Sequence, residues 1–331
     1  MWQGIAGQGR RLLRRLAGGR LTVAGLAGLG AGVAGIYALD LPPTWTLALP
    51  AALLAVNLAT ALGVNPALRR SGGLLVFHVA LLAFLVMLVA GRLTYLRGRV
   101  EVTEGTAFTG TLNEAVAGPL HPWHLPRAAF LQGPFEIPYR ADGSRGDISS
   151  QVSWMDARGT LHQAAISERR PLVLAGYRLA PTANKGFAAV FSWRPEAGAA
   201  QVGSVHFPAY PLNAELQARD WSLPAGGGQL FARLVMAEPP VPEAGPGRFR
   251  LPDEHHLVLR RGDLRRELSP GDSVQLEGGE LRYLRLGTWM GYNVFYDPTV
   301  PWLLACAVVG CLGLGAHYAF AGAPREREVA P

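Results

Sequence analysis

The chain is poor in cysteine: among 331 residues it has only Cys306 and Cys311, both in an apolar run near the C-terminus. Spaced i and i+5, their thiols would point about 140° apart on a helix, so no disulfide between them is expected. We interpret both as small packing residues. The long region 97–297 has no cysteine, so if it is exported it must be stabilised by its own core.

Signatures of several activities are also missing. The chain has no Walker loop, HExxH motif or serine elbow, and no dinucleotide-binding fingerprint set between a strand and a helix. Without CxxC a thiol oxidoreductase is disfavoured, and without CxxCH no c-type haem is attached covalently. The acidic residues of the region 97–297 are scattered near turns, so no pair of hydrolase carboxylates can be identified. We therefore expect a protein that is not an enzyme.

Apolar residues are abundant, and they are concentrated in four runs. Each run approaches or exceeds the roughly 18–20 residues that cross a hydrocarbon core. About 200 residues of ordinary soluble composition separate the third run from the fourth. The sequence predicts a membrane α-helical bundle of four transmembrane helices, plus a mostly β exported domain inserted between helices 3 and 4. The runs are Leu21–Leu39, Leu47–Val64, Leu74–Leu93 and Val300–Phe320.

The first run is predicted to remain as a helix. It is longer than the core of a signal peptide, about 7–15 residues, no small-x-small cleavage site follows it, and a second run begins almost at once.

Positive charge predicts the orientation. Arginines precede the first run, separate the second from the third, and follow the fourth, whereas the turn between the first two runs carries only Asp40 as a charge. By the positive-inside rule, both termini are cytoplasmic and the large domain is periplasmic, on a multi-pass protein of the inner (plasma) membrane. The net charge of +7 then reflects topology, with membrane lipid rather than nucleic acid as the surroundings. The arginines are Arg10, Arg11, Arg14, Arg15, Arg20, Arg69, Arg70, Arg325 and Arg327.

The predicted domains are a basic N-terminus (1–20), transmembrane helices 1–3 (21–95), a periplasmic β-rich domain (96–297), transmembrane helix 4 (298–321) and a cytoplasmic tail (322–331). Several short strands separated by turn residues favour a sandwich or open barrel. The Pro/Gly-rich connector Glu238–Gly247 is predicted to divide this domain. The expected strands are Ile148–Trp154, Leu161–Ile166, Leu172–Arg178, Ala188–Trp193, Gln229–Met236, Leu257–Arg261, Val274–Leu276 and Leu281–Leu286.

Small, polar and aromatic residues suggest how the helices pack and where the membrane ends. The glycines of the first run allow close helix approach, and Asn57 in the second run is expected to hydrogen-bond between helices. Seven aromatic residues are predicted to form an interfacial belt: Trp45, Tyr95, Trp289, Tyr292, Phe295, Tyr296 and Trp302.

Histidines are the main candidates for chemistry. His78 lies near the start of the third run and His317 near the end of the fourth, so antiparallel helices would place both at a similar depth. Two facing imidazoles at one depth are the arrangement that a bis-histidine haem needs. The alternatives are a structural histidine at 78 and an interfacial polar residue at 317. The pair His121 and His124 supplies too few ligands for a metal site without partners.

Asp297 stands where the fourth run begins. Three roles are open for it: capping the helix, pairing with Arg92 or Arg97, or contacting a partner protein.

The segment Leu75–Gly105, in which LVFHVALL leads into GRxxYxRGxVxVxEG, resembles the ResB/Ccs family of System II cytochrome c biogenesis. Tyr292–Pro298 and the pair Arg69-Arg70 fit the same pattern, as does the layout of three helices, a large exported domain and a final helix.

This resemblance implies a non-catalytic partner of a CcsA/ResC-type membrane protein, working with apocytochrome c and an exported thioredoxin-like protein. His78 would ligate a non-covalent haem b shared with the partner, and His317 is a weaker candidate. Asp297 matches an aspartate implicated in the family, and Arg92 lies near it at the predicted interface. The alternative function is a membrane-anchored scaffold for another respiratory or haem-protein complex, without its own haem.

Overall fold

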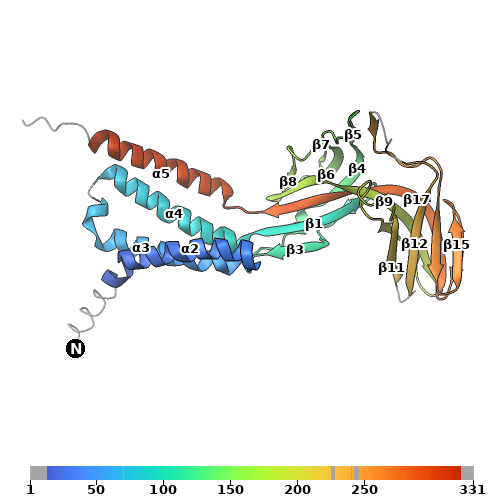
Figure 1. Cartoon of the computed structure of the whole chain (residues 1–331), viewed down its shortest axis with the longest axis horizontal. Helices are drawn as coiled ribbons and strands as arrows, with labels where there is room; N and C mark the ends of the chain where they lie inside the picture. The colour runs from blue at the N-terminus through green and yellow to red at the C-terminus, as the bar shows by residue number, and fades with distance from the viewer. Residues whose placement is uncertain (1–12, 70, 225–227, 240, 242–245, 322–331) are drawn as a thin grey trace, which may run out of the picture. The chain divides into compact units, whose positions relative to one another are not determined.

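The computed structural model describes residues 13–69, 71–224, 228–239, 241 and 246–321. It divides into two units, which we treat separately (Figure 1). The helical unit comprises the described parts of 1–96, 117–122 and 296–331, and the β unit comprises those of 97–116 and 123–295.

The helical unit contains four helices that are long and apolar enough to cross a membrane, as the sequence predicted. A short 3₁₀ helix, η1 (Pro66–Arg69), precedes the third of them. Arg10, Arg11, Arg70, Arg325 and Arg327 lie outside the described residues, and the orientation of the chain stays a prediction. The long helices are α2 (Gly19–Leu39), α3 (Pro43–Val64), α4 (Gly72–Thr94) and α5 (Val300–Ala321).

Small residues let α2 pack closely on α3. A Cβ added at Gly32 would lie 2.8 Å from the carbonyl oxygen of Thr46, so only glycine fits there. Asn57 of α3 donates through Nδ2 to the carbonyl oxygen of Leu16 (2.6 Å) and accepts at Oδ1 from the hydroxyl of Thr22 (2.8 Å). The expected interhelical role of Asn57 is confirmed.

The contact between α4 and α5 also rests on glycine. A Cβ on Gly73 would lie 2.6 Å from the carbonyl oxygen of Gly313, and one on Gly313 would lie 2.8 Å from Cγ1 of Val76. Further along, Gly310 faces Ala80 and Phe77. The stripe Gly73–Val76–Phe77–Ala80 is therefore the face of α4 that contacts α5.

In its described residues the β unit is built from strands, together with the short 3₁₀ helix η2 (Leu125–Ala128). The predicted mostly β domain between the third and fourth helices is confirmed. Its strands are β1 (Leu96–Thr103), β2 (Ala107–Phe108), β3 (Glu114–Ala117), β4 (Phe130–Glu136), β5 (Pro138–Tyr139), β6 (Ser149–Met155), β7 (Leu161–Ile166), β8 (Leu172–Leu174), β9 (Tyr177–Pro195), β10 (Gln201–His206), β11 (Ala218–Ser222), β12 (Gln229–Met236), β13 (Gly247–Arg248), β14 (His255–Arg261), β15 (Leu264–Leu268), β16 (Ser273–Leu276) and β17 (Gly279–Tyr296).

Among the described residues these strands form four sheets. The largest has seven strands in the order β10-β9-β17-β1-β3, with β16 beside β17 and β8 beside β9. Two four-stranded sheets follow the orders β2-β4-β6-β7 and β11-β12-β14-β15, and β5 pairs with β13.

Two strands are much longer than predicted. β9 has 19 residues and β17 has 18, and β17 is the long orange arrow of Figure 1. From the sequence, the glycines within these strands suggest turns that would end a strand. Gly186 instead allows the side chain of Trp289 to approach the backbone of β9 closely. A Cβ there would lie 2.7 Å from Nε1 of Trp289, so the indole needs the space.

Two further predictions about the strands were wrong. The connector Glu238–Gly247 does not divide the domain, because β12 before it and β14 after it are neighbours in one sheet. The predicted strand Leu172–Arg178 is a hairpin, in which Leu174 pairs with Tyr177 across Ala175 and Gly176. Both central residues have positive φ, 50° and 81°, as a type I′ turn requires, and alanine gives little indication of this in the sequence.

The predicted aromatic belt is wrong for Trp289 and Tyr292. Their side chains are 2% and 1% exposed in the core of the β unit, because β17 continues its inward-facing pattern almost to its end. Trp289 donates to the carbonyl oxygen of Phe207 (3.0 Å), and burial raises the pKa of Tyr292 to about 12. Trp45 and Trp302 are exposed on their helices, as belt residues would be.

Candidate functional site

His78 lies on α4 with its two ring nitrogens in different roles. Nδ1 is 2.8 Å from the carbonyl oxygen of Leu74, one turn earlier. Because a carbonyl oxygen only accepts hydrogen bonds, Nδ1 carries a proton in this arrangement, and in the neutral form of the imidazole Nε2 holds the lone pair. A neutral imidazole oriented through one nitrogen is suited to bind a metal through the other.

The side chain of His78 belongs to the face of α4 that packs on α3. At positions i, i+4 and i+7, His78 is in line with Leu82 and Leu85, and both leucines join the cluster around Leu54 and Ala55 of α3. At 100° per residue, this face is roughly 150° around the helix from the stripe that contacts α5. His78 therefore points away from α5.

His317 on α5 is placed differently. Its Nδ1 lies 2.8 Å from the hydroxyl oxygen of Ser71, and its backbone nitrogen would be 2.7 Å from a Cβ on Gly73. His317 is thus level with the first turn of α4, five residues before His78, which corresponds to a rise of about 7.5 Å. The predicted common depth is not observed, and the structure does not bring the two histidines together.

Asp297 organises the start of α5. Its Oδ1 accepts hydrogen bonds from the backbone nitrogen of Thr299 (2.9 Å) and from the hydroxyl of the same residue (2.6 Å). Thr299 in turn offers its carbonyl oxygen to Leu303 (2.8 Å), so Asp297 fixes the turn that leads into the helix. No ion pair joins Asp297 to Arg92, and both of these residues are described.

Arg92 lies in the last turn of α4. Its guanidinium is 5.1 Å from the ring centroid of Tyr95, a cation–π contact, and the hydroxyl of Tyr95 bonds Thr44 of α3 (3.2 Å). The Nε atom of Arg92 is buried, and no described residue accepts its proton. This end of α4 therefore keeps a cation without an acidic partner among the described residues.

A loop of the chain caps this end of α4. The carbonyl oxygen of Leu93 accepts from Leu120 (2.8 Å), that of Thr94 from Nδ1 of His121 (2.8 Å), and that of Tyr95 from Gly118 (2.9 Å). These carbonyls would otherwise lack helical partners. His121 thus has a structural role at the end of α4, which its position in the sequence does not reveal.

His124, the second histidine of the pair considered in the sequence, belongs to the β unit. Its Nε2 lies 3.0 Å from the carbonyl oxygen of Ala175, and its ring contacts Tyr177 edge to face. Among the described residues no group of three or more histidine, cysteine, aspartate or glutamate side chains is placed to hold a metal ion.

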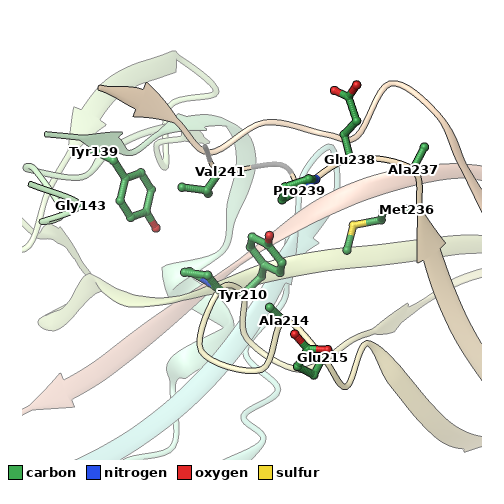
Figure 2. A pocket seen from close by; sticks show the side chains of 11 residues that line it. Tyr139, Gly143, Tyr210, Ala214, Glu215, Met236, Ala237, Glu238, Pro239 and Val241 are labelled. Atoms are coloured by element: carbon green, nitrogen blue, oxygen red, sulfur yellow. The ribbon is translucent and has the colours of Figure 1, made fainter. Parts of the chain in front are cut away.

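The β unit contains a cavity of about 470 Å³ at the connector between β12 and β13. Figure 2 shows Tyr139, Tyr210 and Met236 around it. Nearby, Lys185 is 2% exposed, with Nζ 5.4 Å from the ring centroid of Tyr139 and 5.6 Å from that of Phe249. Burial lowers the pKa of Lys185 to about 8. Lys185 is the only lysine in the sequence, but the sequence does not reveal that it is buried.

Together these features define a membrane-spanning class of protein: four apolar helices carrying a β-rich unit between the third and the fourth. Residues 67–182 of the chain match the model of the ResB-like family, which is associated with cytochrome c biogenesis. The match includes α4 with His78 and the strands from β1 into β9, and it confirms the resemblance seen in the sequence. No curated protein matches the chain significantly.

Proposed function

We propose that this chain is a haem-holding subunit of a cytochrome c biogenesis complex, in which His78 supplies one axial ligand. The observation that carries the proposal is the state of that imidazole: it lies in an apolar helix, its Nδ1 is occupied by Leu74, and its Nε2 is left with a lone pair. An ionisable residue within a membrane span is costly and is usually retained for function.

The second axial ligand is proposed to come from a partner membrane protein of the CcsA/ResC type. This assignment is supported by the placement of His78 on the face of α4 away from α5, and by the hydrogen bond between His317 and Ser71. Haem b bound there would supply the iron porphyrin that is later joined to apocytochrome c. The chain's own part is to hold and orient the imidazole through Leu74.

In this proposal the β unit is periplasmic and serves as a scaffold for the partner and for apocytochrome c, with an exported thioredoxin-like protein supplying reduced thiols. Arg92 and Asp297 are the proposed interface residues. The guanidinium of Arg92, which has no acidic partner among the described residues, supports a contact with an acidic group of the partner.

The alternative function is a scaffold for another respiratory or haem-protein complex without its own haem. The hydrogen bond from His78 to Leu74 favours it, since this bond already provides the imidazole with a structural partner.

The test is to purify the chain together with its membrane partner and record the visible absorption spectrum. A six-coordinate haem spectrum is expected, lost in His78→Ala and retained in the matched variant His317→Ala. Haem-free purification with normal cytochrome c maturation in a deletion strain would establish the scaffold instead.

A further inference from the structure

The strand β10 is an open edge of the largest sheet. Among the described residues it pairs only with β9, in a register that places His206 opposite Ala188. The backbone nitrogen of Phe207 donates to the carbonyl oxygen of Phe187 (2.9 Å), so this next pair is hydrogen-bonded. Hydrogen-bonded and non-hydrogen-bonded pairs alternate along an antiparallel ladder, and the backbone groups of a non-hydrogen-bonded pair point away from the partner strand.

The backbone N–H and C=O groups of Val202, Ser204 and His206 therefore point outward from the sheet. A contact with β11 agrees with this direction, because Nη1 of Arg219 donates to the carbonyl oxygen of His206 (3.2 Å). The outward groups of Val202 and Ser204 have no backbone partner among the described residues. Unpaired groups of this kind are a template for a further strand.

This edge lacks the features that usually protect an edge strand. Gln201–His206 contains no proline, lysine, arginine, aspartate or glutamate, and the side chain of Val202 is 69% exposed. At the edge of another sheet, three of the five residues of β15 are arginine or glutamate. Charged side chains and proline discourage strand addition, so β10 is open to it in a way that β15 is not.

A cavity of about 210 Å³ lies alongside the outward edge of β10. Its lining includes the consecutive residues 201–205 and, across from them, residues 221–224. Consecutive residues of a strand point alternately to its two faces, so five in a row indicate that the cavity borders the edge itself. The lining that the structure describes contains no charged side chain, and Phe191 and Trp221 stack within it at 5.2 Å.

A strand added to β10 would direct one side chain into this cavity. Gly203 lies on the same face of the sheet as Phe191, its partner on β9, and a Cβ added to Gly203 would meet nothing within 4 Å. A residue opposite Gly203 on the added strand would project on that face too. Since a cavity of roughly 150 Å³ holds benzene, the space here admits one aromatic or branched aliphatic side chain.

Side-chain contacts hold β10 in place. Nδ1 of His206 is 2.9 Å from Oε2 of Glu101, and Oγ of Ser204 is 2.7 Å from Oγ1 of Thr103. Both partners of these contacts belong to β1. An edge that is already fixed loses less conformational entropy when it binds.

Charge at one end of the edge adds a further requirement. The guanidinium of Arg219 bonds the carbonyl oxygen of His206 and has no acidic partner among the described residues. A bound segment with a carboxylate at this end would complement it.

We propose that the edge of β10 binds an extended segment of an unfolded polypeptide by strand addition, with one aromatic or branched aliphatic side chain in the cavity and a carboxylate near Arg219. Backbone hydrogen bonds to Val202 and Ser204 supply affinity, and the cavity selects the side chain. An unfolded chain offers free backbone donors and acceptors along its length, whereas a folded protein has paired most of them. The inference rests on the scaffold role proposed above for the β unit, in which apocytochrome c is the bound chain.

The test uses the full chain in detergent and a fluorescein-labelled peptide, Asp-Thr-Thr-Phe-Thr-Thr-Asp, with binding followed by fluorescence anisotropy. The aspartate at each end reaches Arg219 in either strand direction. Binding is expected, and it should weaken by about 10–100-fold when the Phe of the peptide is replaced by Ser, because burial of that ring is lost. Gly203→Phe, which fills the cavity from the protein side, should weaken binding of the Phe peptide to a similar extent.

A substitution at Val202 tests the backbone contacts. Val202→Pro removes an outward N–H and leaves the hydrogen bonds to β9 intact, whereas the conservative variant Val202→Thr keeps that N–H. Binding should be lost in Val202→Pro and retained in Val202→Thr, and the peptide should slow hydrogen exchange at the amide of Ser204.

Absence of binding to the native chain, or equal affinity in the two folded Val202 variants, would overturn the proposal. The assay contains no haem, so such a result is distinct from a failure of the haem proposal, which is read from the absorption spectrum.

Discussion

An imidazole in lipid and an ammonium in a protein core meet the same difficulty, which is the loss of water around an ionisable group. At His78, Nδ1 lies 2.8 Å from the carbonyl oxygen of Leu74 and donates its proton to it. The ammonium of Lys185 instead lies over the ring faces of Tyr139 and Phe249. The hydrogen bond of His78 leaves its Nε2 available to bind a metal. Burial of Lys185 lowers its pKa, so keeping this lysine protonated reduces the stability of the folded chain.

Replacing Lys185 with methionine is expected to stabilise the folded chain at pH 7. Lowering the pKa of this lysine from 10.5 to about 8 corresponds to roughly 3 kcal/mol against folding, partly offset by cation–π contacts of about 1–2 kcal/mol. The penalty is complete below pH 8, where the folded state must hold the proton. It is relieved as pH rises from about 8 toward 10.5, because only the unfolded state then remains protonated.

Thermal denaturation of Lys185→Met and the native chain in the same detergent checks this. The variant should unfold at a higher temperature at pH 7, and the difference should shrink by pH 9. A difference that is absent at pH 7, or that grows with pH, would refute the account of Lys185.

Single residues differ in how well the sequence predicts them. His78 and Asn57 stand out because a polar side chain is rare in an apolar run. The cluster of Glu101 and His206 could not be predicted, since it joins residues 105 positions apart and depends on how the strands are arranged.

At the scale of elements, the helices and the strands depend on close approach at glycine. In α5, Gly313 lies against the backbone of α4, whereas an added Cβ on Gly315 would meet nothing within 4 Å. The two glycines are two residues apart in one helix and differ mainly in this contact, so they form a matched pair.

We expect Gly313→Val to destabilise the packing of α4 and α5 by about 1–3 kcal/mol, since the neighbouring helix must move to admit the side chain. Gly315→Val should have little effect. Melting temperatures of both variants in one detergent measure the difference, and equal values for the two would contradict the proposed packing.

Element prediction succeeded where periodicity and turn residues agreed. The strands Leu161–Ile166 and Gln229–Met236 have the bounds that the sequence predicts. It failed in β9 and β17, because glycines such as Gly186 are required there by a facing indole and not by a turn. In the sequence, a glycine that is needed for close approach between distant strands cannot be distinguished from a glycine that ends a strand.

At the scale of the whole molecule, the sequence predicts the class well: four apolar helices and an inserted β domain are both observed. The orientation rests on the positive-inside rule alone, since several of the arginines that support it lie outside the described residues. The side of the membrane that holds the β unit is therefore the broadest prediction left to measure.

Cysteine labelling in intact cells tests it. With Cys306 and Cys311 replaced by alanine, a cysteine at Arg158, exposed in the turn between β6 and β7, should react with a membrane-impermeant maleimide. A cysteine at Arg69, in η1 between α3 and α4, should react only after the membrane is permeabilised. The opposite pattern would place the β unit in the cytoplasm.

The central claim is that Nε2 of His78 binds haem iron. It is tested most directly by the visible absorption spectrum of His78→Gly, purified with its membrane partner, with and without added imidazole. We expect the six-coordinate spectrum to be lost in the variant and restored by imidazole, which can occupy the space left by the side chain. An unchanged six-coordinate spectrum in His78→Gly without imidazole would contradict the claim.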